Sequence, residues 1–151
     1  YAKEYFEGIG AEIMGAGKFG FHDHPDDPNW RGWWGDEPPF HCPVFVLTHN
    51  SRPSMEMAGG TIFHFINTSI DDALQQATDV AGQEDVRIGG GPTVVREYLK
   101  AGLIDRLHVA IAPILLGRGI RLWDDLRGLE KNYAVKSETA ESGTIHLTLQ
   151  R

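Results

Sequence analysis

The pattern of apolar and polar residues divides the chain into short strands that alternate with helices. The continuous apolar run at 43–48 is typical of a strand covered on both faces. Shorter apolar stretches predict three further strands, at 11–14, 61–66 and 85–88. The segment 106–116 is rich in branched residues and predicts a long strand, which Gly117 and Gly119 end.

Two stretches have the apolar spacing and the end signals of amphipathic helices. In the first, Thr68 and Ser69 offer N-caps before apolar residues that share one helical face, namely Ile70, Ala73, Leu74, Ala77 and Ala81. Gly82 is a suitable residue to end this helix. In the second, Pro92 suits the first helical position and Gly102 ends the helix, with inward residues Val94, Val95, Tyr98 and Leu99.

The remaining segments comprise a closing hairpin, a long loop and the start of the chain. Apolar and polar residues alternate at 144–150, which predicts a hairpin with 133–139 that turns at 141–143. The stretch 15–42 has no sustained periodicity, and a loop of this length in a compact domain usually serves a site. Residues 2–7 resemble the end of a helix that Gly8 stops, so we expect that an upstream piece is missing.

Strands that alternate with helices predict an α/β fold with a mainly parallel sheet, to which the closing hairpin adds antiparallel strands at one edge. We find no internal repeat, and 151 residues fit one domain, so a single domain is expected over residues 1–151.

Composition and charge narrow the classes of partner. The formal net charge is −7 and no basic stripe is present, so nucleic acid is not an expected partner. No apolar run is long enough to cross a bilayer, so no membrane association is expected. Cys42 is the only cysteine, which excludes an internal disulfide and a cysteine-based zinc site. A reducing, cytoplasmic setting is the simplest interpretation.

The strongest local motif is V-R-I-G-G-G-P-T at 86–93, where a strand ends, three glycines turn and a helix begins. Glycines let a backbone approach a ligand closely, and the start of a helix presents unpaired N–H groups and a partial positive charge. Together these features are typical of a pyrophosphate cradle. A tight turn without a ligand is the alternative, and the motif alone does not separate the two.

Two other predicted strands also end in residues suited to a nucleotide. The stretch 13–18 ends in glycines and Lys18, which could reach a phosphate, although a plain turn is the alternative. The stretch 46–52 ends in hydroxyl, imidazole, amide and guanidinium groups that suit a ribose or its 2′-phosphate, although a polar loop would look the same. All three motifs fall at carboxyl ends of strands, where open α/β sheets bind ligands.

The long loop carries histidines, aspartates and tryptophans. His22 and His24, flanked by aspartates, could bind a metal, but loop histidines are usually solvated and no metal is predicted. Trp30, Trp33 and Trp34 could stack on a flat heteroaromatic ring or could pin the loop to the core. Cys42 is expected to be a packed residue.

Several of these motifs, taken together and in order, resemble the dihydrofolate-reductase-like family. They are I-M-G at 13–15, P-V-F-V-L-T-H at 43–49, I-G-G-G at 88–91 and L-I-D-R-L-H-V-A-I-A-P-I-L-L-G-R-G at 103–119. The similarity is greatest to the branch related to the reductase domain of the bacterial bifunctional riboflavin-biosynthesis deaminase-reductase. It implies a three-layer fold with a mostly parallel central sheet, helices on both faces and a C-terminal antiparallel hairpin. The family's first strand and the loop after it have no counterpart in this chain.

The resemblance also implies an oxidoreductase that uses NADPH to reduce a small heterocyclic substrate, pterin-like or ribosylaminopyrimidine-like. By motif, it implies cofactor contacts from Gly15, Ala16, Gly17, Lys18, Leu47, Thr48, His49, Asn50, Arg52, Ile88, Gly89, Gly90, Gly91, Pro92, Thr93 and Val94. It implies substrate contacts from Trp33, Trp34, Leu116 and Gly117. The branch often forms dimers, so a homodimer is among the implied assemblies.

The chain departs from the family where Ala16 and Lys18 stand in place of the frequent Arg and Thr. Lys18 replaces only part of what an Arg fork offers a phosphate. No catalytic residue is predicted, and Asp36 and Glu37 are the loop acids nearest the tryptophans. The alternatives are a nucleotide-binding protein that keeps the fold without the chemistry, and a metal-dependent enzyme built on the His22–His24 loop.

Overall fold

The computed structural model describes residues 4–151. The chain forms two compact units, the first ending at Val95 and the second beginning at Arg96, and each is described by itself. No helix within the described residues is long and apolar enough to cross a membrane. The prediction of a single domain over 1–151 stays a prediction.

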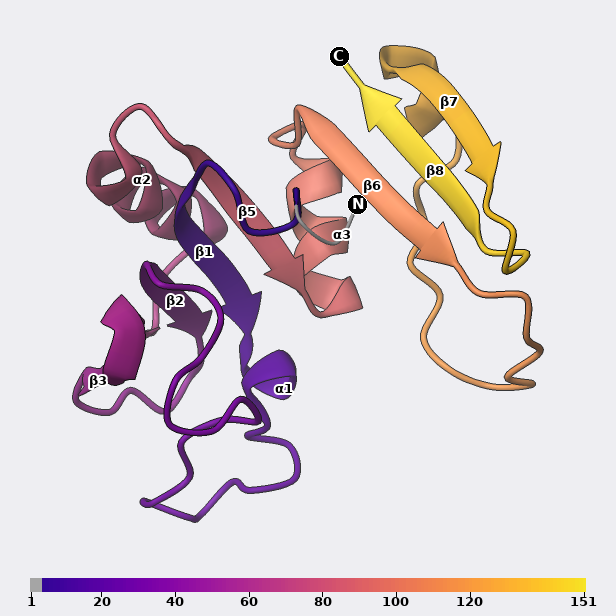
Figure 1. Ribbon diagram of the computed structural model, residues 1–151. Helices are drawn as coiled ribbons and strands as arrows, with labels where there is room; N and C mark the ends of the chain where they lie inside the picture. Colours follow the sequence, from indigo (N-terminus) through magenta and orange to yellow (C-terminus); the bar gives the residue numbers. More distant parts are fainter. Residues whose placement is uncertain (1–3) are drawn as a thin grey trace. The chain divides into compact units, whose positions relative to one another are not determined.

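The first unit is built on a five-stranded sheet with the strand order β3-β4-β2-β1-β5. Figure 1 labels β3, β2, β1 and β5 of this sheet. Neighbours among β1, β2, β4 and β5 run parallel, and only β3 runs antiparallel, beside β4. The strands span Ile9–Gly15 (β1), Pro43–Leu47 (β2), Met55–Glu56 (β3), Ile62–Ile66 (β4) and Asp85–Gly90 (β5). The predicted α/β fold with a mostly parallel central sheet is confirmed.

The helix α2 (Ile70–Ala81) packs against β1, β2 and β5 (Figure 1). Its first turn is fixed by Ser69, whose side chain accepts a hydrogen bond from the backbone N of Asp72 at 3.1 Å, as the capping pattern predicts. The residues that it buries are small, namely Ala73, Ala77 and Ala81. Small side chains allow the helix to approach the sheet closely, and a Cβ at Gly10 would lie 2.8 Å from Ala81 Cα.

The long loop covers the sheet with aromatic side chains. It begins with the short helix α1 (Ala16–Phe19), whose Phe19 is fully buried and lies with its ring centre 5.1 Å from that of Phe63. Trp34 packs against Phe63 and Phe40, with ring centres 5.9 and 5.0 Å away. A short 3-10 helix, η1 (Ala58–Gly60), precedes β4. Cys42 is buried in this aromatic core, as expected.

The second unit contains a three-stranded antiparallel sheet with the order β6-β8-β7. Its strands are β6 (Arg106–Ile111), β7 (Ala134–Thr139) and β8 (Ile145–Gln150). The helix α3 (Pro92–Lys100) starts in the first unit, and its buried residues Tyr98 and Leu99 belong to the second. A 3-10 helix, η2 (Leu129–Asn132), precedes β7. The predicted hairpin is confirmed.

Three expectations need correction. The hairpin pairs with β6 in a separate sheet and does not extend the edge of the parallel sheet. The predicted strand 106–116 ends at Ile111, because Pro113 has no N–H and restricts the residue before it. Residues 4–8 form turns where a helix end was expected, and Gly8 has a φ of 70°. The rest of that predicted helix, residues 2 and 3, lies outside the described residues.

Candidate functional site

The three predicted nucleotide-binding motifs lie at one edge of the five-stranded sheet. The strand β1 lies between β2 and β5 and runs parallel to both. At its carboxyl end, Gly15 is in register with Leu47 of β2, and Met14 is in register with Gly90 of β5. The structure therefore brings the segments after these strands together at the edge where α/β sheets bind ligands.

Gly89 and Gly90 are the last two residues of β5, where a turn was expected, and Gly91 follows them directly before α3, which begins at Pro92. We call residues 89–91 the glycine turn. Gly90 has a φ of 122°, a conformation that side chains rarely adopt, and the Gly90–Gly91 peptide bond is cis. A Cβ added at Gly91 would meet no atom within 4 Å. The turn thus presents open backbone at the start of a nine-residue helix, which fits an anionic group such as a pyrophosphate.

The segment after β1 lies against this turn. A Cβ at Gly15 would come within 2.8 Å of Val94 Cγ2, so Gly15 allows β1 and the start of α3 to approach closely. A Cβ at Gly90 would lie 3.8 Å from Lys18 Cδ, which places the Lys18 stem beside the turn. Lys18 is exposed. It is therefore a cation at the glycine turn that a bound phosphate could reach.

The segment after β2 is polar, and it begins with the partly buried Thr48. The backbone N of Thr48 donates to Ile66 O at 3.0 Å, and the backbone N of Asn50 donates to the Thr48 hydroxyl at 3.1 Å. His49 and Asn50 are exposed. Arg52 is engaged within the protein, since its guanidinium donates to Trp30 O at 3.3 Å and Asp27 O at 3.4 Å. Arg52 would therefore have to share or break these hydrogen bonds in order to contact a phosphate as predicted.

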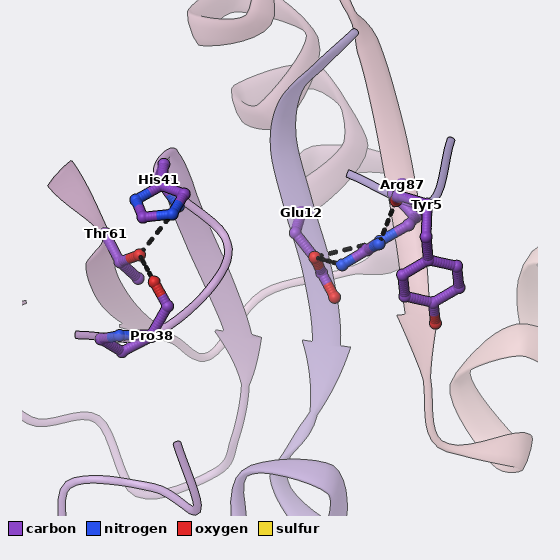
Figure 2. A network of polar contacts seen from close by, with 6 residues as sticks. All are labelled: Tyr5, Glu12, Pro38, His41, Thr61 and Arg87. Atoms are coloured by element: carbon purple, nitrogen blue, oxygen red, sulfur yellow. Dashed lines mark hydrogen bonds and ion pairs between the residues drawn. The ribbon is translucent and has the colours of Figure 1, made fainter. Parts of the chain in front are cut away.

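A buried ion pair, absent from the sequence-based prediction, lies beneath this edge. Glu12 of β1 is in register with Arg87 of β5, and Arg87 donates from Nε and from Nη2 to Glu12 Oε2 (Figure 2). Glu12 is 1% exposed and the Arg87 side chain 15%. The signal in the sequence was one acid in an otherwise apolar strand and one base in a second strand, and only the strand register pairs them.

The electrostatics of Glu12 reflect its burial. Burial raises the pKa of Glu12 above its ordinary value, while the positive charges of Arg87 and Lys18 act in the opposite direction. Removing a carboxylate from water costs free energy that a single ion pair often does not fully recover. Lys18, Glu12 and Arg87 thus form one interacting set of charges at the glycine turn.

The two predicted substrate tryptophans of the long loop have different environments. Trp34 is packed into the aromatic core, so it pins the loop. Trp33 is 53% exposed and lies edge-on to Trp30, with ring centres 4.6 Å apart. Trp30 is itself fixed, since its Nε1 donates to Phe19 O at 2.9 Å and its ring stacks on His24. Of these side chains, Trp33 offers a free surface to a flat ligand.

The other candidate residues belong to other segments of the chain. Leu116 and Gly117 belong to the second unit, in the exposed segment after β6. Asp36 pairs with Arg31 at 3.6 Å, and both are exposed. In residues 4–151, no group of three or more His, Cys, Asp and Glu side chains is placed to hold a metal ion.

Comparison with known proteins identifies the family. A model of the RibD C-terminal domain matches residues 1–146. The chain belongs to the RibD C-terminal domain family. The resemblance to the riboflavin-type reductase branch is therefore confirmed.

Relatives of this RibD C-terminal domain include proteins with and without an assigned activity. Uncharacterized protein YyaP of Bacillus subtilis is 26% identical over 118 residues, a match that covers 74% of this chain and 61% of YyaP. Riboflavin biosynthesis protein RibD of Aquifex aeolicus is 34% identical over 56 residues, covering 36% of this chain and 16% of RibD. The chain thus matches less than two thirds of the length of either relative.

Solved structures show the same fold. A protein from Shewanella sp. PV-4 named for riboflavin biosynthesis aligns with a TM-score of 0.65 and 22% identity, over 95% of this chain and 74% of that one. A pyrimidine reductase-like protein from Corynebacterium diphtheriae aligns with a TM-score of 0.52 and 15% identity, over 94% and 75%. Acinetobacter baumannii RibD aligns with a TM-score of 0.55 and 20% identity, over 94% of this chain and 47% of RibD.

Proposed function

We propose that this domain is an NADPH-dependent reductase that acts on a small heterocycle, pterin-like or ribosylaminopyrimidine-like. The observation that carries the proposal is the register of β1 with β2 and β5, which gathers at one edge of a parallel sheet the three segments that the sequence predicts to bind a nucleotide. Membership of the RibD C-terminal domain family supports a reductase role in riboflavin biosynthesis. From the single cysteine we propose a cytoplasmic location, and from the resemblance a homodimer.

In this proposal, the cofactor is held by backbone and by few charges. Gly15, Ala16, Gly17 and Lys18 would face its pyrophosphate from one side, and residues 89–94 would face it from the other. Thr48, His49, Asn50 and Arg52 would take the adenosine ribose and its 2′-phosphate. NADPH supplies a hydride when bound, and the nicotinamide would lie near Ile88 and Gly89.

The protein's part in the reduction is to bind, orient and exclude water. The substrate would gain a hydride from the bound NADPH at the carbon of a polarised C=N or C=O bond, and a proton from water or a carboxylic acid at its nitrogen or oxygen. Trp33 would stack on the flat substrate ring, since its indole is exposed.

The test is a titration with NADPH and NADH, followed by nicotinamide fluorescence and by the shift in melting temperature. We expect NADPH to bind, and Lys18→Ala to weaken the binding by about tenfold, the size of one charge-assisted hydrogen bond. Lys131→Ala, in η2 of the second unit, is the matched control. No binding of either dinucleotide would refute the proposal.

A second function, nucleotide binding without turnover, is favoured by Ala16, which stands where the family often has an Arg that grips phosphate. A substrate panel of pteridines, ribosylaminopyrimidines and simple carbonyl compounds separates the two. Oxidation of NADPH in the presence of one substrate class supports the reductase. Tight binding with no oxidation across the panel supports the binding protein.

A further inference from the structure

The Glu12–Arg87 ion pair is firmly anchored on its Arg87 side. The Arg87 guanidinium donates from Nη1 to the backbone oxygen of Tyr5 (Figure 2). It also lies 4.3 Å from the centre of the Tyr5 ring and 4.6 Å from that of Phe6. Stacking and hydrogen bonding together hold the planar group in one orientation. Glu12 therefore receives its two hydrogen bonds from a donor that is itself fixed.

The other carboxylate oxygen of Glu12 lies against the glycine turn. A Cβ added at Gly89 would come within 1.8 Å of Glu12 Oε1, so no side chain fits between them. The φ of Gly89 lies outside the left-handed region, so the carboxylate and not the backbone conformation requires glycine at this position. One carboxylate thus connects the anchored Arg87 to the first residue of the turn.

The charge balance of the pair suits an anion site. An isolated carboxylate beneath the turn would repel a pyrophosphate, and Arg87 offsets that charge at hydrogen-bonding distance. The pair also interacts with Lys18, the cation beside the turn. Glu12 is 1% exposed, so it acts from beneath the backbone and does not touch the ligand.

We propose that Glu12, held by Arg87, is a positioning residue that fixes the turn Gly89–Gly91 in the conformation that receives the dinucleotide. This inference rests on the proposed function. The mobility of the turn tests the role of Glu12, and NADPH binding by the wild type tests the proposed function, so a negative result for one leaves the other measurable.

The first experiment compares Glu12→Ala with Thr61→Val. Thr61 is fully buried, and its hydroxyl accepts from His41 N at 2.9 Å and donates to Pro38 O at 3.2 Å, at the amino end of β4 (Figure 2). Both variants lose a buried polar group, but only Glu12 touches the glycine turn. Amide hydrogen exchange is measured for peptides that cover residues 86–94, and the Kd for NADPH is measured where both variants are folded.

We expect Glu12→Ala to raise exchange in residues 86–94 and to raise the Kd by about tenfold, the effect of one misplaced hydrogen-bonding group. Thr61→Val should lower the melting temperature and leave both readouts unchanged. Glu12→Gln keeps the size of the side chain and one oxygen that can accept from Arg87, with its NH2 group in the place of Oε1 beside Gly89, so it should restore most of the protection of the turn. Equal exchange in the turn for Glu12→Ala and Thr61→Val would overturn the positioning role.

The second experiment tests the contact directly. Gly89→Ala in the wild-type background must displace Glu12, so we expect increased exchange in the turn and weaker NADPH binding. In the Glu12→Ala background the same substitution should cause no further change in the exchange of residues 86–94, because the obstructing carboxylate is absent. If the effects of Gly89→Ala and Glu12→Ala on exchange in the turn add, the contact between Glu12 and Gly89 does not hold the turn. A wild-type protein that binds no dinucleotide would refute the proposed function, and hydrogen exchange would still decide the role of Glu12.

Discussion

Arg52 places its guanidinium 4.5 Å from the centre of the Phe21 ring, and so joins the segment after β2 to the long loop. The same group lies 5.5 Å from the centre of the Phe65 ring and donates to two carbonyl oxygens of the loop, those of Asp27 and Trp30. A planar cation between aromatic rings and carbonyls is a geometry that arginine fills and lysine does not. Arg52 therefore holds the loop that presents Trp33.

Replacing Arg52 by Lys should loosen the long loop. Lysine keeps the charge but loses the forked hydrogen bonds and most of the stacking, at a cost of about 1–2 kcal/mol in the free energy of unfolding. Limited proteolysis should cut faster within residues 20–35, and tryptophan fluorescence should shift to the red. Arg118→Lys, at an exposed position of the second unit, is the control. An unchanged cleavage rate would show that Arg52 does not hold the loop.

Gly10→Ala should destabilise the first unit by about 1–3 kcal/mol, as other overpacked sites do. The added Cβ would lie 2.8 Å from Ala81 Cα and 2.9 Å from both Ala81 Cβ and Ala81 O, so it collides with the backbone of α2 as well as with a side chain. Ala81→Gly should consequently relieve only part of the loss. Chemical unfolding measures both, with Gln76→Ala on the exposed face of α2 as the control. A fully restored stability would indicate that the backbone contact is unimportant.

His64 should make the protein less stable in acid. Burial lowers the pKa of His64 below its ordinary value of 6.5, and the neutral ring contacts the Ser54 hydroxyl at 2.8 Å from Nδ1. Because the pKa is lowered in the folded state, the contribution of His64 to the free energy of unfolding is complete above pH 6.5. It is lost as the pH falls through the pKa of the folded state. Melting temperatures of wild type and His64→Gln should converge as the pH falls. Parallel pH profiles of the two proteins would contradict this role.

Cys42 should be unreactive in the folded protein. Burial, with a smaller contribution from the charge of Glu12, raises the pKa of Cys42 from 9.0 to about 11. The thiol stays protonated in the fold while the unfolded chain ionises, so its contribution to stability is present below pH 9.0 and is lost as the pH rises towards about 11.

Alkylation by iodoacetamide at pH 8 tests the Cys42 prediction. It should proceed only after unfolding in guanidinium, because the thiolate is the reactive form. Cys42→Ala should show a shallower loss of stability between pH 9.0 and about 11 than the wild type. Rapid labelling of the native protein would contradict the expected burial.

Local signals predicted those features that depend on neighbours in sequence. Ser69 caps α2 because a hydroxyl placed three residues before a free backbone N–H bonds to it in any context. The start of α3 followed from Pro92 in the same way, whereas β5 continues through Gly89 and Gly90, which were expected to turn. The end of β6 is also predictable from the sequence, since Pro113 lies two residues after Ile111 and cannot donate to a neighbouring strand.

Features that depend on register could not be predicted. Glu12 and Arg87 are 75 residues apart, and nothing local indicates that β1 and β5 align them. The separate antiparallel sheet is a similar case, because alternation at 144–150 indicates one buried face without indicating which sheet the strand joins. The role of Trp34 as a core residue and the exposure of Trp33 depend on how the loop folds back, which adjacent indoles in a sequence do not reveal.

The separation of Glu12 and Arg87 also constrains the order of folding during synthesis. At about 5–20 residues per second, a ribosome needs about 4–15 s to extend the chain by the 75 positions from Glu12 to Arg87. During that interval β1 has been made but its β5 neighbour has not, and burying Glu12 would leave a charge without its partner. The centre of the sheet must therefore stay open to water until Arg87 emerges, which makes the closing of β5 onto β1 a late step in the folding of the first unit.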